Sequence, residues 1–170
     1  YILSDSTDPT HWVREELEWQ ALRRNLGSNI FYRHRPLNTG RKSGNIQDFC
    51  ENWGQLYDYM VILDADSLMT GTALERLVAM MDANPRTALI QVPPRLAGRS
   101  SPFARILQFA SSVYGPISVA GLAFLQAADG NYWGHNAIIR VRAFMQDCGL
   151  PRLPGRPPFG GEIMSHDFVE

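Results

Sequence analysis

Two aspartates one residue apart, Asp64 and Asp66, follow a short apolar run and are the first candidates for chemistry. The run, residues 59–63, is rich in aromatic and β-branched side chains, which predicts a strand buried on both faces. In an extended segment, side chains at i and i+2 point to the same side, about 6.5 Å apart. Two carboxylates there suit a hard divalent cation that keeps other positions for water and phosphate oxygens. The alternative is a solvated turn, where aspartate is common.

Length and composition limit the possible classes of protein. The chain has 170 residues, of which 45% are hydrophobic, enough for one globular domain with a core. Its formal net charge is −1 and it has no basic run, which argues against nucleic acid as a partner. Cys50 and Cys148 give neither a disulfide framework nor a metal-binding spacing and fit a reducing compartment. Because the chain begins in an expected strand and stops in an expected helix, we expect it to be a piece of a longer protein.

The elements expected around these aspartates alternate between strand and helix, which is typical of a parallel α/β sheet. Strands are predicted at residues 1–3, 30–32, 59–63, 88–92 and 134–140, and helices at 9–26, 44–53, 72–83 and from 144. Asp8 is the expected N-cap of the first helix and Gly27 its end. Thr72 and Glu75 are expected to form a capping box for the third helix.

One uncharged segment, residues 106–128, must be compared with a membrane span. Its 23 positions are enough in principle to cross a bilayer. Only 15 of them are apolar, however, and Gly115 and Pro116 interrupt it in the middle. We therefore expect a buried or interfacial pair of helices here rather than a span.

Further candidates for chemistry lie in three loops. Asp5 follows the first strand, although it could equally be a turn aspartate that bonds its own backbone. Arg41 and Lys42 belong to a glycine-containing basic loop before a helix, a suitable place for an anion unless the loop is simply solvated. Asp167 follows a proline-rich loop and opens the last expected helix, where its alternative role is an N-cap.

Together these pieces resemble the family 2 glycosyltransferases, inverting enzymes with the nucleotide-sugar-binding GT-A fold. Ser4-Asp5-Ser6-Thr7-Asp8 resembles the first aspartate motif of the family, and Asp5 matches the carboxylate that contacts the nucleoside. Lys42-Ser43-Gly44-Asn45 resembles the Lys-x-Gly-Asn stretch of the cellulose-synthase branch. Asp64-Ala65-Asp66 falls where the family keeps its metal-binding Asp-x-Asp, and Ser165-His166-Asp167 falls where Thr-Glu-Asp supplies the catalytic base.

A narrower resemblance is to an inner-membrane branch of this family that polymerises glucose into osmoregulated periplasmic glucans. Residues 132–140 and the glycine- and proline-rich residues 149–163 carry it, and it covers nearly the whole chain. Two features depart from the family pattern. His166 replaces the glutamate of Thr-Glu-Asp, which leaves Asp167 as the obvious base, and the later Gln-x-x-Arg-Trp motif is not contained in the chain.

The resemblance implies a fold and a domain plan. The fold would be α/β of the GT-A type, Rossmann-like, with a mixed but mainly parallel sheet flanked by helices and incomplete at both ends. Residues 1–95 would form the nucleotide-sugar-binding part, and residues 96–170 the part for the acceptor and the catalytic base.

The resemblance also implies substrates and site residues. The donor would be UDP-glucose and the acceptor a growing β-glucan, with Mg²⁺ or Mn²⁺ bound by Asp66 and Asp64. Asp5 and Lys42 would contact the nucleotide, and Asp167 would take the proton of the attacking hydroxyl. The parent protein would sit in the inner membrane through helices outside this chain, with this domain on the cytoplasmic face. Tyr132 and Trp133 could form a platform for a sugar ring, with core packing as the equal alternative.

Two other functions stay open at this point. Residues 61–66 also resemble the nucleophile motif of haloacid-dehalogenase-type phosphatases, although their lysine follows that motif, whereas Lys42 precedes it here. The chain could also be a binding module that senses UDP-glucose without consuming it.

Overall fold

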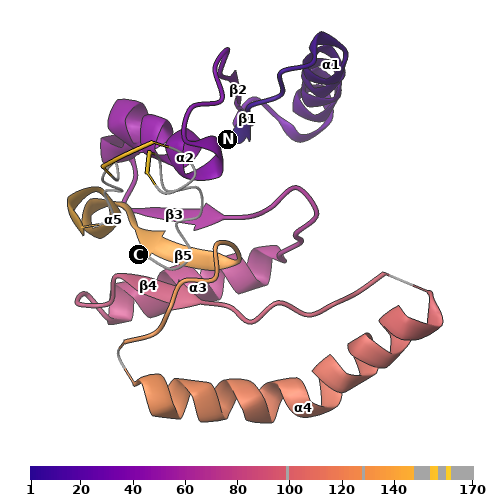
Figure 1. Ribbon diagram of the computed structural model, residues 1–170, viewed down its shortest axis with the longest axis vertical. Helices are drawn as coiled ribbons and strands as arrows, with labels where there is room; N and C mark the ends of the chain where they lie inside the picture. The colour runs from indigo at the N-terminus through magenta and orange to yellow at the C-terminus, as the bar shows by residue number, and fades with distance from the viewer. Residues whose placement is uncertain (99, 128, 148–153, 157–159, 162–170) are drawn as a thin grey trace. The chain divides into compact units, whose positions relative to one another are not determined.

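The structure is a computed structural model that describes residues 1–98, 100–127, 129–147, 154–156 and 160–161 (Figure 1). The chain divides into two compact units. Among the described residues, unit 1 contains Tyr1–Asp58 with 144–147, 154–156 and 160–161, and unit 2 contains Tyr59–Ala143. A short helix, α5 (Val141–Asp147), passes from one unit into the other.

Unit 1 is built on a pair of parallel strands. β1 (Ile2–Ser4) pairs with β2 (Tyr32–His34), with Ile2 opposite Tyr32 and Ser4 opposite His34. Helix α1 (Pro9–Leu26) connects them, and α2 (Arg41–Trp53) with the 3₁₀ turn η1 (Gly54–Leu56) follows β2. The parallel pairing agrees with the predicted strand-helix-strand pattern, although β2 begins two residues later than the expected strand at 30–32.

The predicted ends of α1 are confirmed. The Asp8 carboxylate accepts a hydrogen bond of 2.8 Å from the backbone N–H of Thr10, and Pro9 is the first helical residue. Gly27 ends the helix with a φ of 105°, and its N–H donates to the Arg23 carbonyl at 3.1 Å. These caps depend only on adjacent residues, which is why the sequence predicts them well.

Unit 2 contains a three-stranded sheet in which β5 (Ala137–Arg140) lies between β3 (Tyr59–Ile62) and β4 (Leu89–Gln91). β5 is antiparallel to both neighbours, as the arrows in Figure 1 show. β3 and β4 therefore run in the same direction, as alternation predicts, but they do not pair with each other. The expectation of a mainly parallel sheet holds for β1 and β2 and is wrong for this sheet. Alternation gives the direction of successive strands but not the place of a strand that returns between them.

The core of unit 2 lies between α3 (Gly71–Ala83) and the sheet. Leu77 and Met81 of α3 are buried against Ile138 of β5, which is fully enclosed. The N-cap of α3 is Thr70, whose Oγ1 accepts from the Ala73 N–H at 3.2 Å. The expected capping box of Thr72 and Glu75 is therefore wrong, because the helix begins one position before Thr72.

Residues 102–126 form one long helix, α4 (Pro102–Gln126), instead of the expected helix pair. Pro116 lies inside it, and Figure 1 shows a bend near its middle. The helix is long and apolar enough to cross a membrane by length and composition alone, and none of its residues is buried. The expectation of two helices separated at Pro116 is thus wrong, because the helix continues through Pro116 with a bend.

Candidate functional site

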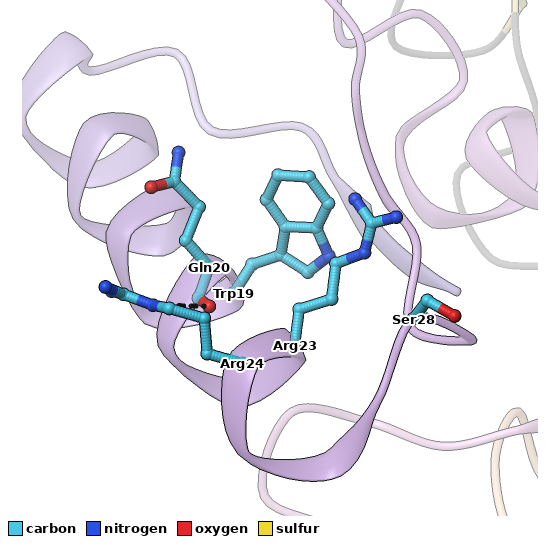
Figure 2. A pocket seen from close by; sticks show the side chains of 5 residues that line it. All are labelled: Trp19, Gln20, Arg23, Arg24 and Ser28. Carbon is cyan, nitrogen blue, oxygen red and sulfur yellow. Dashed lines mark hydrogen bonds between the residues drawn. The ribbon is translucent and has the colours of Figure 1, made fainter.

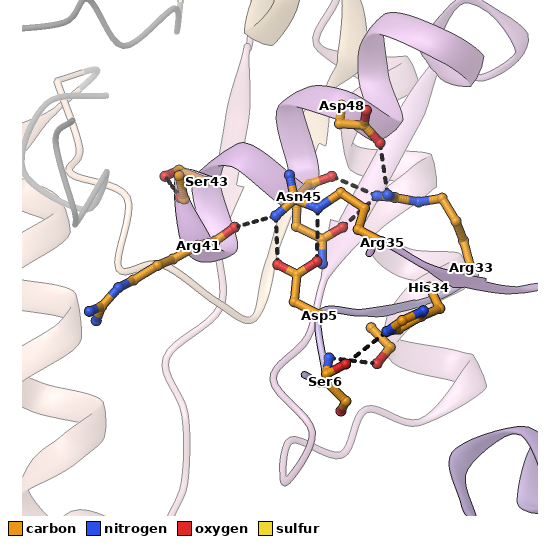
Figure 3. Close-up of polar contacts among 11 residues, drawn as sticks. Asp5, Ser6, Arg33, His34, Arg35, Arg41, Ser43, Asn45 and Asp48 are labelled. Atoms are coloured by element: carbon orange, nitrogen blue, oxygen red, sulfur yellow. Dashed lines mark hydrogen bonds and ion pairs between the residues drawn. The ribbon is translucent and has the colours of Figure 1, made fainter. Parts of the chain in front are cut away.

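In unit 1, the site is organised by an ion pair at the carboxyl ends of β1 and β2. Asp5 follows β1 and Arg35 follows β2, and the Arg35 N–H continues the ladder by donating to the Ser4 carbonyl at 3.0 Å. The Arg35 guanidinium donates to both carboxylate oxygens of Asp5, at 2.8 and 2.6 Å (Figure 3). Parallel strands bring their carboxyl ends to one edge, where open α/β sheets bind ligands. Asp5 therefore lies where the sequence predicts it, but with a partner that the sequence did not reveal.

The start of α2 lies beside this ion pair. Gly40 and Arg41 both have positive φ, 66° and 50°, so the chain turns sharply into the helix. The Arg41 carbonyl accepts a 3.2 Å hydrogen bond from Nη2 of Arg35, while its guanidinium points away from Asp5 (Figure 3). Lys42 occupies the first turn of the helix, which begins three residues earlier than predicted. A helix N-terminus that carries Arg41 and Lys42 is suited to bind an anionic group.

Two further residues of α2, Gly44 and Asn45, serve packing in this structure. A Cβ on Gly44 would lie 2.1 Å from the Thr39 carbonyl oxygen, so only glycine fits. The Asn45 side chain is buried and both its Oδ1 and its backbone carbonyl accept hydrogen bonds from Arg33. These contacts explain the residue types at the last two positions of Lys42-Ser43-Gly44-Asn45 without a ligand.

A further carboxylate of unit 1, to which the sequence did not point, accepts hydrogen bonds from the residues on both sides of Asp5. Glu15 of α1 accepts hydrogen bonds from the hydroxyls of Ser4 and Ser6, both at 2.5 Å, and of Tyr32 at 3.0 Å. Burial alone would raise the pKa of Glu15, but these three hydrogen bonds outweigh burial and lower that pKa. The network fixes the residues on both sides of Asp5. Its sequence signal is weak, because Glu15 is separated from its partners by 9 to 17 positions.

In unit 2, Asp64 and Asp66 lie in a turn that follows β3. The strand ends at Ile62, and the Ser67 N–H donates to the Asp64 carbonyl at 3.0 Å, which closes a four-residue turn. Asp64 is half-buried and Asp66 is exposed. The expected extended geometry, with both carboxylates on one side of a strand, is therefore wrong. The two side chains do follow a strand end, as predicted.

The donor set around this turn limits the kind of metal site that could form there. Within the described part of the chain, no group of three or more His, Cys, Asp or Glu residues could hold a metal ion. Two carboxylates alone suit a hard cation such as Mg²⁺, which usually keeps several waters and is shared with substrate phosphates. The residues fit such a shared site and do not fit a closed, all-protein site.

The loop before β5 contacts the same strand end. The Asn136 N–H donates to the Ile62 carbonyl at 2.8 Å, and the Asn136 carbonyl accepts from the Val92 N–H at 2.9 Å. Asn136 has a φ of 54°, which asparagine tolerates better than most residues, and its buried Oδ1 has no hydrogen-bond partner among the described residues. Sequence reasoning gave Asn136 no separate role, and its positive φ has no clear sequence signal.

The two aromatic residues of this loop differ in burial. Tyr132 is only 2% exposed and belongs to the core, so it does not form a sugar platform in this structure. Trp133 is half-buried, and its backbone N–H donates to Oε1 of Gln91 at 3.0 Å. Of the two, only Trp133 keeps surface that a ligand could contact.

Asp167, the predicted base, lies outside the described residues.

A surface hollow of about 420 Å³ lies elsewhere on unit 1, at the end of α1 (Figure 2). Arg23 stacks over the Trp19 ring at 5.4 Å, and the Trp19 indole N–H donates to the Ile30 carbonyl at 2.9 Å. Of the predicted site residues that the structure describes, none lines this hollow, and Arg23 and Trp19 already contact each other there. We assign it no part in the site.

The comparisons with known proteins agree on one family. Residues 2–147 match the model of glycosyl transferase family 2. The whole chain is 54% identical to glucans biosynthesis glucosyltransferase H of Dickeya dadantii (strain 3937), over 20% of that protein. Identities to the proteins of the same name are 55% in Rhodopseudomonas palustris (strain TIE-1), over 23% of its length, and 52% in Escherichia coli (strain K12), over 20%. The chain thus spans about a fifth of the length of these relatives. No solved structure matches it significantly.

Proposed function

The chain belongs to glycosyl transferase family 2, and on that premise we propose that it is part of an enzyme that transfers glucose from UDP-glucose to a growing β-glucan. The similarity to glucans biosynthesis glucosyltransferases along the whole chain supports the osmoregulated periplasmic glucan backbone as the product. The reaction would be a single displacement, in which a sugar hydroxyl attacks the anomeric carbon opposite the leaving diphosphate and inverts it. This membership leaves the phosphatase alternative without support.

The single observation that carries the proposal is the ion pair of Asp5 and Arg35 beside the start of α2. Each oxygen of a carboxylate has two lone pairs, and the Arg35 fork uses one lone pair on each. Asp5 can therefore still accept hydrogen bonds from a nucleoside N–H or hydroxyl while Arg35 keeps its plane fixed. Lys42 and the N–H groups at the start of α2 would face the diphosphate in this arrangement.

Asp66, assisted by Asp64, would hold the divalent cation. When bound, Mg²⁺ or Mn²⁺ would neutralise negative charge on the leaving diphosphate. The turn at residues 64–67 supplies two carboxylates and leaves the remaining positions to water and phosphate. The hydrogen bond from the Asn136 N–H to the Ile62 carbonyl fixes the end of β3, after which this turn begins.

Asp167 would accept the proton of the attacking hydroxyl. A general base needs hydrogen-bond reach of that hydroxyl more than an unusual pKa. The parent protein would be anchored in the inner membrane by helices outside this chain, with this part on the cytoplasmic face.

The test uses the parent protein in membranes and compares three substitutions. Asp66→Ala should abolish polymer synthesis and metal-dependent UDP binding. Asp167→Asn should keep UDP-glucose affinity within a few fold and lower turnover by about 10²–10⁴. Asp58→Asn, at the other end of β3 and exposed, is the matched control and should leave both unchanged.

Three results would contradict the proposal. If Asp66→Ala kept metal-dependent UDP binding and polymer synthesis, Asp64 and Asp66 would be turn residues without a role in metal binding. Near-normal turnover in Asp167→Asn would move the base to another group. A parent protein that binds UDP-glucose but never consumes it, with acceptor present, would favour the sensing module.

A further inference from the structure

The apolar side chains of α4 lie on one side of the helix. At 3.6 residues per turn, nine large apolar side chains fall within an arc of about 160°. They are Phe103, Ile106, Leu107, Phe109, Val113, Tyr114, Ile117, Phe124 and Leu125. The polar side chains fall on the opposite arc, namely Arg105, Gln108, Ser111, Ser112, Ser118 and Gln126. The helix is therefore amphipathic along its whole length, with Val119 and Leu122 as the exceptions.

The apolar side of α4 is the exposed side. Ile117, Phe124 and Leu125 are 75%, 85% and 80% exposed. The half-buried residues of the helix lie almost all on the polar arc and include Gln108, Ser111 and Gly115. A helix on the surface of a globular protein has the reverse arrangement. Its apolar face therefore needs an apolar surface that this chain's described residues do not supply.

The charges around α4 indicate what that surface is. Between Asp82 and Asp129 the sequence has no acidic residue and four arginines, at positions 86, 95, 99 and 105. Arg95 and Arg105 are exposed. An apolar face with aromatic side chains, next to a purely basic stretch, complements an anionic lipid surface.

We propose that α4 lies in the interface of an anionic lipid bilayer, with its axis in the membrane plane. Its apolar arc enters the acyl-chain boundary, and Arg95 and Arg105 contact the headgroups. Length and composition alone would also allow a span, but a spanning helix in contact with lipid would expose the polar arc to hydrocarbon. Pro116 frees the Ser112 carbonyl from its helical hydrogen bond, and Ser112 lies on the polar side, where water and headgroups can satisfy that carbonyl.

Binding to vesicles tests this placement with the purified chain. Vesicles of phosphatidylethanolamine and phosphatidylglycerol at 3:1 should carry the chain in flotation, and phosphatidylcholine vesicles should carry much less. Ile117→Glu should lower the partition coefficient about tenfold or more, because a buried apolar side chain is lost. Ser112→Glu adds the same charge on the polar arc of the same helix and should change it less than about threefold. Replacing Arg95 and Arg105 by Gln should remove the preference for anionic vesicles.

The orientation of the helix is tested by spin labels at positions 106, 113 and 124, in a background with both cysteines replaced by serine. In-plane binding predicts similar depths at all three, measured by oxygen and nickel-chelate accessibility. A deep centre with shallow ends would instead show a span. Circular dichroism checks that each variant keeps its helix content. If the chain is recovered only in detergent, the same labels are measured in the parent protein in inner-membrane vesicles.

Several outcomes would overturn the proposal. The chain could stay in the aqueous fraction with both kinds of vesicle, or equal effects of Ile117→Glu and Ser112→Glu could be found. Dimerisation without vesicle binding, detected by sedimentation, would assign the apolar face to a second copy. None of these readouts depends on glycosyl transfer, so they are separate from the test of the proposed function.

Discussion

Arg35 binds Asp5 through two parallel hydrogen bonds, from Nε to Oδ1 at 2.8 Å and from Nη2 to Oδ2 at 2.6 Å. Both side chains are nearly enclosed, with 12% and 13% of their surface exposed. The hydrogen bonds to Asp5 raise the pKa of Arg35 above its usual value. Since the residues are 30 positions apart, the pair joins the ends of two strands. It fixes the plane of the carboxylate that we propose to contact the nucleoside.

A double-mutant cycle measures this pair. We expect Asp5→Ala and Arg35→Ala to show a coupling free energy of about 1–3 kcal/mol in urea unfolding. Either substitution alone already removes the charge-assisted, bidentate contact, so the double mutant does not lose it a second time. The control is the ion pair of Arg33 and Asp48, where the Asp48 side chain is 42% exposed and water screens the charge. Its coupling should stay below about 1 kcal/mol. Additive effects of Asp5→Ala and Arg35→Ala would contradict the structural role of the pair.

The Glu15 network predicts a pH-dependent contribution to stability. The pKa of Glu15 lies below its ordinary value of 4.5 in the folded chain, so its stabilisation is complete above pH 4.5 and is lost as pH falls through the lower folded pKa. Glu15→Gln should lower the free energy of unfolding by about 1–3 kcal/mol at pH 7. The gap to the unmodified chain should shrink on acidification below pH 4.5. Glu16→Gln, at the exposed neighbouring position, is the control and should show no such trend.

We predict that a side chain at Gly44, in the Lys-x-Gly-Asn stretch, would destabilise the fold by steric overlap. Gly44→Ala would place a Cβ 2.1 Å from the Thr39 carbonyl oxygen, and backbone must move to relieve the overlap. We expect a loss of about 1–3 kcal/mol in unfolding free energy. Gly71→Ala is the matched control, since nothing lies within 4 Å of its Cβ, and it should be neutral or slightly stabilising. Equal effects of the two changes would mean that the α2 turn adapts.

We predict that Arg140, a charged residue of unit 2, makes a large contribution to the free energy of unfolding. Its guanidinium donates to the carbonyls of Met81, at the end of α3, and of Thr87, before β4, at 3.1 and 3.2 Å, and stacks on Tyr59 at 5.1 Å. Arg140→Met should lower the free energy of unfolding by about 2–3 kcal/mol, because the carbonyls lose a charged donor. Arg142→Met, at an exposed position two residues on, should change it by less than about 0.5 kcal/mol. Similar midpoints for the two variants in urea would contradict this role of Arg140.

The ends of α1 were predictable because they depend on neighbouring residues, whereas the N-cap of α3 was placed two residues too late. Asp8, Pro9 and Gly27 bound α1 as expected, since each acts within one helical turn. The boundaries of β2 and α2 moved by a few residues, because tertiary contacts of Arg33 and Arg35 decide where those elements begin. The place of β5 could not be predicted, since no periodicity records which strand enters a sheet between two others.

The candidate site was predictable in its positions but not in its contacts. Asp5, Asp64 and Asp66 do follow strand ends, because a polar residue after an apolar run is visible in the sequence. Arg35 and Glu15 were missed, since each reaches its partners across 9 to 30 positions. The extended spacing assumed for Asp64 and Asp66 was wrong because a backbone hydrogen bond to Ser67 turns the chain.

The central position of β5 determines the order in which unit 2 can form. During synthesis β3 and β4 leave the ribosome long before residues 137–140, and neither has its partner until then. α3 can form early, but the side of the sheet on which Leu77 and Met81 pack is incomplete without Ile138. The long connection that contains α4 must therefore be synthesised before β5 can pair with β3 and β4. Because these contacts join residues far apart in the sequence, we expect unit 2 to fold late. A nascent chain stopped before residue 137 would hold two unpaired strands.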